Sequence, residues 1–100
     1  MDRGASGPEV IALLLALKLN FPKSVVMLRG NHETRDMTEG FNYRTQCLER
    51  FGDLEMYERS MELFDLLPLA CCVNGEYLCM HGGVSVELTS LARINRVNRK

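Results

Sequence analysis

The sequence lacks an excess of charge of either sign. Twelve lysine and arginine residues stand against thirteen aspartate and glutamate residues, which leaves a formal net charge of -1. Such a chain has no long-range field to attract nucleic acid or an anionic membrane, so any partner has to be recognised locally. We therefore expect neither nucleic acid nor a membrane among its partners.

Long apolar runs, repeats and low-complexity tracts are also missing. The apolar stretch Val10–Leu17 is far too short to span a bilayer, which takes about 20 residues. Asp2 and Glu9 precede it, Lys18 follows it, and no small-residue cleavage site comes after, so we do not expect a secretory signal peptide. The absence of repeats argues against a solenoid or fibrous chain.

The cysteines form no C-x-x-C pair. Cys71 and Cys72 are adjacent and would point to opposite faces of a strand. A vicinal thiol pair can bind a soft metal, but the apolar neighbours favour a packed strand. We interpret all four as small buried hydrophobic residues in a reducing compartment, which predicts a cytoplasmic and also a nuclear location; they are Cys47, Cys71, Cys72 and Cys79.

What the sequence does contain is enough apolar material for a core. With 100 residues, of which 46% are hydrophobic, the chain can form one small domain or a piece of a larger one. Ser6-Gly7-Pro8-Glu9 predicts a helix start, because it offers a capping side chain, an early proline and an early acid. The helix should run to about Leu19 and be well covered, since few polar residues interrupt any face. Asn20-Phe21-Pro22 ends it.

A buried strand and two further helices are predicted next. Ser24–Leu28 is too uniformly apolar for a half-exposed strand. A helical period then runs from Met37 to about Phe51, and its candidates for the buried side are Phe41, Tyr43 or Arg44, Cys47, Leu48 and Phe51. After Gly52-Asp53, Leu54–Leu66 forms the next helix, which Pro68 stops. The residues spaced to line its buried face are Met56, Tyr57, Met61, Phe64 and Leu67.

The last third of the chain predicts a hairpin and a short helix. Leu69–Val73 and Tyr77–Met80 flank Asn74-Gly75, which is the strongest short signal for a two-residue hairpin turn. The tail Glu87–Val97 carries apolar residues at three-residue steps and predicts a helix. Helix, strand, two helices, two strands and helix place the chain in the α/β or α+β class.

Three polar clusters adjoin the strand-like segments: Asp2-Arg3-Gly4, Gly30-Asn31-His32-Glu33 and His81-Gly82-Gly83. In open α/β sheets, sites form at the carboxyl ends of strands. Two of the clusters follow such ends directly. About one strand-helix-strand unit separates the first cluster from the second, so both can lie at the same edge of a sheet.

The residue types in these clusters suit one kind of chemistry. Aspartate, asparagine and histidine offer the carboxylate oxygen, amide oxygen and neutral imidazole that a hard or borderline dication accepts. Arg3 can clamp a phosphate with its forked guanidinium. A histidine beside an aspartate can be held as an imidazolium and give a proton to a leaving alkoxide. The combination favours phosphoester hydrolysis by a metal-bound water.

Each cluster also has a purely structural interpretation, which the residues leave open. Asp2-Arg3-Gly4 can be a turn or a frayed end, and Gly30–Glu33 a loop with a capping residue. His81 before two glycines can be a strand that ends in a flexible turn. What favours a site is that both histidines of the chain fall at strand ends beside glycine.

The same clusters resemble signature motifs of the PPP-type serine/threonine protein phosphatases. The matching motifs are the DRG of Asp2–Gly4, the LRGNHE of Leu28–Glu33 and the HGG of His81–Gly83. The intervening segments resemble the family too, and MTEGFNYRTQC and FDLLPLA are most similar to its calcineurin branch. The resemblance implies a calcineurin-like metallophosphatase fold, a β-sandwich flanked by helices, of which residues 1–100 would form the central portion of the catalytic domain.

What the resemblance implies for function is specific. Asn31 and His81 would be ligands of one of two metal ions, which are manganese, iron or zinc in the family. His32 would be the general acid, Asp2 would orient it, and Arg3 with Asn31 would hold the substrate phosphate. The implied activity is hydrolysis of phosphoserine and phosphothreonine in proteins by a metal-activated water, with phosphoproteins and a regulatory subunit as partners.

The resemblance also has departures. The family's GD-x-H-G motif and bridging aspartate would lie before Met1, and a further histidine ligand and an arginine beyond Lys100. The chain alone would then supply ligands to one metal only. Ser85-Val86 stands where the family usually has Ser-Pro. A truncated, inactive fragment that acts at most as a binding module is therefore the second hypothesis, and the uncovered strand Val25–Leu28 predicts poor solubility.

Overall fold

Helix α1 (Gly7–Asn20) opens the fold in the computed structural model, which describes residues 1–99. Its bounds agree with the predicted helix, but its cap does not. Ser6 makes no side-chain cap hydrogen bond; instead the Gly7 N–H donates to the Gln46 side-chain oxygen at 2.8 Å. Nor is the helix well covered, because Leu13 and Leu19 are 61% and 79% exposed. Its apolar contacts with the core come from Ile11, which is buried, and Leu15, which is partly buried.

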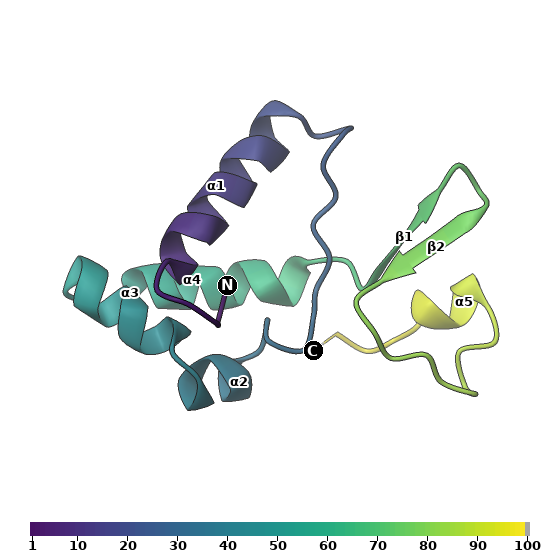
Figure 1. The fold of residues 1–100 in the computed structure, drawn as a ribbon. Coiled ribbons are helices and arrows are strands. Elements are labelled where there is room, and N and C mark those ends of the chain that lie inside the picture. The colour runs from purple at the N-terminus through teal and green to yellow at the C-terminus, as the bar shows by residue number, and fades with distance from the viewer. Residues whose placement is uncertain (100) are drawn as a thin grey trace.

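The predicted strand over residues 24–28 is wrong. These residues run as an irregular segment from the end of α1 toward the centre of the molecule (Figure 1). A strand is defined by ladder pairing with a neighbour, and within residues 1–99 the only strands that pair are the two of the hairpin. The Lys18 side chain of α1 donates to the Val25 carbonyl at 2.8 Å. Just after the segment, the Arg29 N–H donates to the Pro68 carbonyl at 2.9 Å.

The helix predicted over residues 37–51 is two helices, α2 (Arg35–Gly40) and α3 (Tyr43–Phe51). The break has a specific cause. The N–H groups of Asn42 and Tyr43 donate to one carboxylate oxygen of Asp2, at 3.2 and 2.9 Å. The first N–H groups of a helix have no partner within it, so an acceptor brought from the chain's start satisfies them and fixes where α3 begins.

Helix α4 (Glu55–Leu66) confirms its prediction and supplies three of the seven buried apolar residues of the core. It packs with α3, and α3 packs with α1 and α2. Phe41, Leu48 and Phe51 were expected on the buried side but are 47%, 44% and 51% exposed. Phe41 lies between the two helices, and the side of α3 that packs on the core is that of Tyr43 and Cys47. The buried apolar cluster consists of Ile11, Tyr43, Cys47, Tyr57, Met61, Phe64 and Leu67.

The hairpin of β1 (Ala70–Val73) and β2 (Tyr77–Met80) is antiparallel, with Val73 opposite Tyr77. Asn74 and Gly75 both have positive φ, 53° and 75°, as a type I′ turn requires. The loop holds one residue more than predicted, because Glu76 closes the turn with its N–H on the Val73 carbonyl but pairs with no strand residue. The tail forms only α5 (Leu91–Ile94), which buries no residue, rather than a helix over residues 87–97.

The cysteine prediction holds for one residue in four. Cys47 is buried, whereas Cys71 is half-buried and Cys72 and Cys79 are exposed; all four are free thiols. The hairpin stands beside the helices with both faces largely uncovered by residues 1–99 (Figure 1). Its thiols therefore face outward although its strand pattern is correct.

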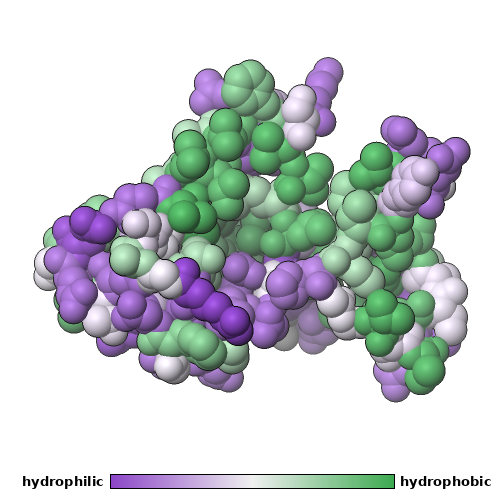
Figure 2. Space-filling view, viewed as in Figure 1, coloured by the Kyte–Doolittle hydropathy of each residue, from purple (hydrophilic) through white to green (hydrophobic). Residues whose placement is uncertain are grey.

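Apolar side chains gather on one open face of the molecule. Figure 2 shows them over α1 and around the hollow beside it. A cavity of about 270 Å³ lies there, lined by residues of α1, of segment 25–28 and of the end of α4. The radius of gyration is 14.9 Å, against about 13 Å for a closed domain of this length. None of the helices within residues 1–99 is both long and apolar enough to cross a membrane.

Candidate active site

The loop Gly30–Thr34 carries two of the predicted site residues and is held by its own atoms. The Gly30 N–H donates to the Glu33 carboxylate at 2.6 Å. The Thr34 hydroxyl donates to the Asn31 carbonyl at 3.0 Å. These two bonds fold the loop back on itself, so that Asn31 and His32 project from a tight turn.

Asp2 and His32 meet across 30 positions of sequence. His32 Nδ1 lies 2.9 Å from the second carboxylate oxygen of Asp2. The Asp2 side chain is 1% exposed and that of His32 is 16% exposed. Because the other Asp2 oxygen already accepts the N–H groups of Asn42 and Tyr43, the carboxylate acts as an acceptor throughout. The ring proton therefore lies on Nδ1, and Nε2 is the nitrogen left for a substrate.

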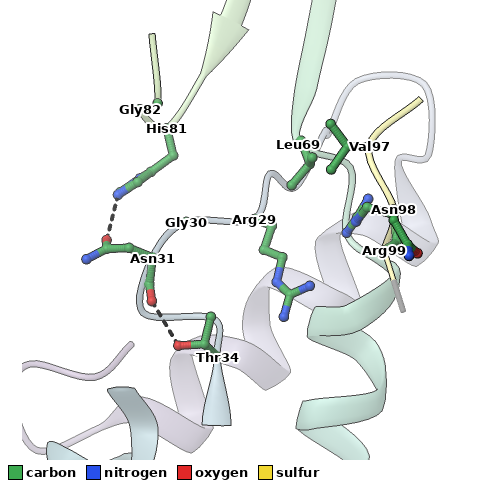
Figure 3. A pocket seen from close by; sticks show the side chains of 11 residues that line it. Arg29, Gly30, Asn31, Thr34, Leu69, His81, Gly82, Val97, Asn98 and Arg99 are labelled. Atoms are coloured by element: carbon green, nitrogen blue, oxygen red, sulfur yellow. Dashed lines mark hydrogen bonds between the residues drawn. The ribbon is translucent and has the colours of Figure 1, made fainter. Parts of the chain in front are cut away.

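Asn31 and His81 form a second pair, between the loop and the end of β2. The Asn31 amide oxygen and His81 Nε2 lie 3.0 Å apart, and Figure 3 shows the two side chains pointing toward one another. The His81 ring can come this close to the loop because Gly30 has no side chain. A Cβ at position 30 would lie 3.0 Å from the His81 ring and 2.7 Å from the Glu33 carboxylate, closer than carbon atoms in proteins normally come.

Phe41 belongs to the site although the sequence placed it in a buried helix face. Its ring packs edge-on against His32 with centroids 4.6 Å apart. The Arg3 guanidinium lies 6.0 Å above the same ring, within the range of a cation–π contact. Arg3 is otherwise exposed, so the aromatic ring is what places it beside His32. No local pattern in the sequence marked Phe41 as part of the site, because its role comes from contacts with His32 and Arg3.

Two cavities adjoin these pairs. One, of about 340 Å³, is lined by Met1, Asp2, Arg3, Leu28, His32, Glu33 and His81. The other, of about 810 Å³, has Asn31 and His81 on one side and Arg29, Leu69 and Arg99 on the other (Figure 3). His81 borders both. Every predicted site residue thus lines at least one of these two cavities.

Comparisons with known proteins identify the family. Residues 1–100 match the model of the Metallophos family, the calcineurin-like phosphoesterases. The chain belongs to the calcineurin-like phosphoesterase family. This confirms the metallophosphatase fold expected from the motifs.

Two members of this phosphoesterase family are similar to the chain over nearly its whole length. The chain is 46% identical over 99 residues to the serine/threonine-protein phosphatase 2B catalytic subunit A2 of Saccharomyces cerevisiae. It is 42% identical over 99 residues to subunit A1 of the same yeast. Both alignments cover 99% of this chain but only 16% and 18% of those proteins. The chain therefore spans less than a fifth of the length of these relatives.

A solved phosphatase structure has the same arrangement of elements. The protein is a serine/threonine phosphatase from Saccharomyces cerevisiae with similarity to the human phosphatase PP5. It superposes with a TM-score of 0.90 and 30% identity, over 99% of this chain and 31% of that one. The fold of this chain therefore superposes closely on a part of a larger phosphatase.

The family implies bound metal ions, and one pair of side chains fits a metal. An amide oxygen and an imidazole nitrogen are donors that divalent metals accept. Their separation of 3.0 Å matches two neighbouring ligands whose bonds to an ion are about 2.1 Å long at a right angle. Residues 1–99 contain no group of three or more His, Cys, Asp or Glu side chains arranged around one point. Asn31 and His81 would together offer two such donors.

Asp65 is the site-supporting residue that sequence reasoning missed. One of its carboxylate oxygens accepts from Arg29 at 3.0 Å and the other from Arg35 at 2.9 Å. The Arg35 hydrogen bond foremost, with the charges of both arginines, holds the pKa of Asp65 below its usual value. Nothing in the local pattern of α4 marks this residue, because its two partners are 30 and 36 positions away.

Proposed function

We propose that this chain carries the acid-catalysis and phosphate-binding part of a metal-dependent phosphatase that hydrolyses phosphoserine and phosphothreonine in proteins. The observation that supports it most directly is the Asp2–His32 pair, 2.9 Å apart and nearly buried, beside the Asn31–His81 pair at 3.0 Å. His32, the proposed proton donor, and Asn31, a proposed metal ligand, are thus neighbours on one loop, and His81 reaches that loop from the end of β2. The relatives named as serine/threonine-protein phosphatases support the substrate class.

His32 is the residue that handles a proton. Asp2 accepts from Nδ1 and so fixes the orientation of the ring, which leaves Nε2 to protonate the serine or threonine oxygen as it leaves phosphorus. The contact with Phe41 limits rotation of the ring from its other side. A general acid held in this way contributes a factor of about 10² to 10⁴ in rate.

Arg3 and Asn31 hold the substrate phosphate in this proposal. Arg3 supplies charge and a forked set of donors, which suit phosphate oxygens, and its place over Phe41 keeps it beside His32. Asn31 and His81 would hold a metal ion, which when bound supplies Lewis-acid polarisation of the phosphoester. The free thiols of all four cysteines support a reducing, cytoplasmic or nuclear location.

The test is manganese-dependent hydrolysis of a small aryl phosphate by the purified chain. We expect turnover that falls at least about 100-fold in His32→Ala. Asn31→Ala should lose activity too, whereas Asn20→Ala, an exposed asparagine at the far end of α1, should retain it. A folded chain whose manganese-dependent activity survives His32→Ala would refute the proposal, whereas a folded chain that hydrolyses nothing would favour the second hypothesis, an inactive fragment.

A further inference from the structure

The loop that carries Asn31 and His32 is tied to α4 on both of its sides. Residues 24–28, before it, belong to no helix or strand. Thr38 of α2, whose hydroxyl donates to the Thr34 carbonyl and lies 3.1 Å from that of Tyr57, provides one link to α4. The contacts of the flanking arginines with α4 provide another, beside the Asp2–His32 and Asn31–His81 hydrogen bonds.

Asp65 binds the two arginines that flank this loop. Arg29 stands directly before the loop and Arg35 directly after it, and each donates to a different oxygen of the one carboxylate. Arg29 also donates through Nε to the Glu33 carbonyl at 2.9 Å. A single side chain on α4 thus closes a ring that runs through Arg29, the loop and Arg35.

The end of α4 gathers further donors around the same point. The Arg29 N–H bonds the Pro68 carbonyl at 2.9 Å. The Arg99 guanidinium bonds the carbonyls of Asp65 and Leu67 at 3.1 and 2.7 Å. The last carbonyls of a helix have no partner within it and carry partial negative charge, so they favour cations there. Figure 3 shows Arg29 and Arg99 converging on this end of the helix.

The exposed fractions of the three side chains show which contact with Asp65 contributes more to holding the loop in place. Arg29 is 17% exposed, Asp65 37% and Arg35 53%. The Arg29 contact is thus shielded from water, while the Arg35 contact is at the surface and is worth less. Both depend on the same carboxylate, so removal of its charge affects both ends of the loop at once.

We propose that Asp65 is a positioning residue for the site: by binding Arg29 and Arg35 together, it sets where Asn31 and His32 stand relative to Asp2 and His81. The residue itself touches neither of the catalytic side chains. The proposal rests on the proposed function only for the roles given to Asn31 and His32. The geometry that it predicts can be tested without any turnover.

The experiment compares amide hydrogen exchange by NMR in the full 100-residue chain and in Asp65→Asn. Asparagine keeps the size of the side chain but has one acceptor oxygen, so it can serve Arg29 or Arg35 but not both. We expect the amides of Arg29 and Gly30 to exchange roughly fivefold faster relative to the amide of Met61, which lies in the buried middle of α4. The matched control is Glu62→Gln, an exposed carboxylate on the same helix that pairs with Arg59 alone.

A ring-current shift gives a second readout that loss of stability alone would not move. The His32 ring lies edge-on to Phe41, so its carbon-bound protons are shifted by that ring. In Asp65→Asn we expect these shifts to move toward the values of a free histidine, and in Glu62→Gln to stay. Equal acceleration of exchange at Gly30 and Met61, or unchanged His32 shifts, would overturn the proposal.

A double-mutant cycle tests whether the loop is held through one shared carboxylate or through two independent contacts. Because Arg35 acts through Asp65, Arg35→Met added to Asp65→Asn should accelerate exchange at Gly30 no further than Asp65→Asn alone. Arg29→Lys keeps the charge but lacks the fork that reaches Glu33 and Asp65 together, and should reproduce the effect of Asp65→Asn. Additive effects of the two substitutions in the cycle would contradict the proposed shared role.

Discussion

Replacement of Gly30 by alanine is the most direct test of the site's geometry. The backbone of Gly30 is not in the left-handed region, so alanine brings no backbone strain and any effect arises from the added methyl group. That methyl would stand 2.7 Å from the Glu33 carboxylate and 3.0 Å from two atoms of the His81 ring. Ordinary contacts begin near 3.4 Å, so the carboxylate has to move by about 0.7 Å and the ring by about 0.4 Å.

Both movements disturb bonds that build the site. The Glu33 carboxylate would leave the Gly30 N–H, which it now accepts at 2.6 Å. The His81 ring would move relative to Asn31, whose amide oxygen is now 3.0 Å from Nε2. Overpacking of this kind typically costs about 1–3 kcal/mol. At about 4–8 °C per kcal/mol for a chain of this size, we expect a melting temperature lower by at least roughly 4 °C.

The chain offers a matched control beside the same histidine. Gly82 follows His81, has no positive φ, and a Cβ there meets nothing within 4 Å. Thermal unfolding of Gly82→Ala should therefore coincide with that of the original chain. Manganese titration followed by paramagnetic broadening of the His81 signals should show weaker binding in Gly30→Ala, by about tenfold or more. If Gly30→Ala and Gly82→Ala behave alike in both assays, the close approach of Gly30 to His81 does not shape the site.

Three further predictions concern the core, the thiols and pH. Tyr43→Phe removes a buried hydroxyl 2.7 Å from that of Ser60 and should cost about 1 kcal/mol in denaturant unfolding; an unchanged midpoint would contradict that bond. Burial raises the pKa of the Cys47 thiol, so alkylation followed by mass spectrometry should modify exposed Cys72 far sooner, unless the helical core is open. The folded-state pKa of Asp65 is lowered, first by the Arg35 hydrogen bond. Its contribution to stability is therefore present above the usual value of 3.8 and disappears as pH falls through the depressed pKa; a difference in melting temperature between the original chain and Asp65→Asn that persists at the lowest pH would refute this linkage.

Local signals in the sequence predicted those elements that local interactions determine. The Asn74-Gly75 turn requires positive φ at both positions, and a dipeptide that accepts it is visible in the sequence. Helix α4 has the apolar spacing of a helix that packs on one side, and its core residues were correctly chosen. In both cases the partners are close in sequence or share one face.

Distant partners account for the errors. The helix over residues 37–51 is broken by a carboxylate 40 positions upstream, which no periodicity reveals. Segment 24–28 has the composition of a buried strand, but strand pairing needs a neighbour, and residues 1–99 provide none for it. The exposed leucines of α1 arise in the same way, since its pattern is that of a helix covered on several sides.

The sequence predicted the residues of the candidate site but not the residues that hold them in place. Glycine beside histidine at strand-like ends pointed to Asn31, His32 and His81, and the polar Asp2-Arg3-Gly4 cluster pointed to Asp2 and Arg3. The resemblance then gave each of these residues a specific role. Phe41 and Asp65 were missed as parts of the site because their roles come from contacts with residues far away in sequence. Their side chains position other residues, and no local sequence pattern marks a residue with that role.

Asp2 forms hydrogen bonds with both the helical core and the candidate site. Its two oxygens divide between the start of α3 and the His32 ring, and Tyr43, whose N–H it accepts, is a fully buried core residue. The carboxylate that orients the proposed acid is thus fixed by the same hydrogen bonds that begin α3. Asp65 fixes the other side of the loop through α4. Because α3 and α4 pack on one another, the helix pair holds both carboxylates at a set separation, which explains how a site at the open edge of this fold keeps its geometry.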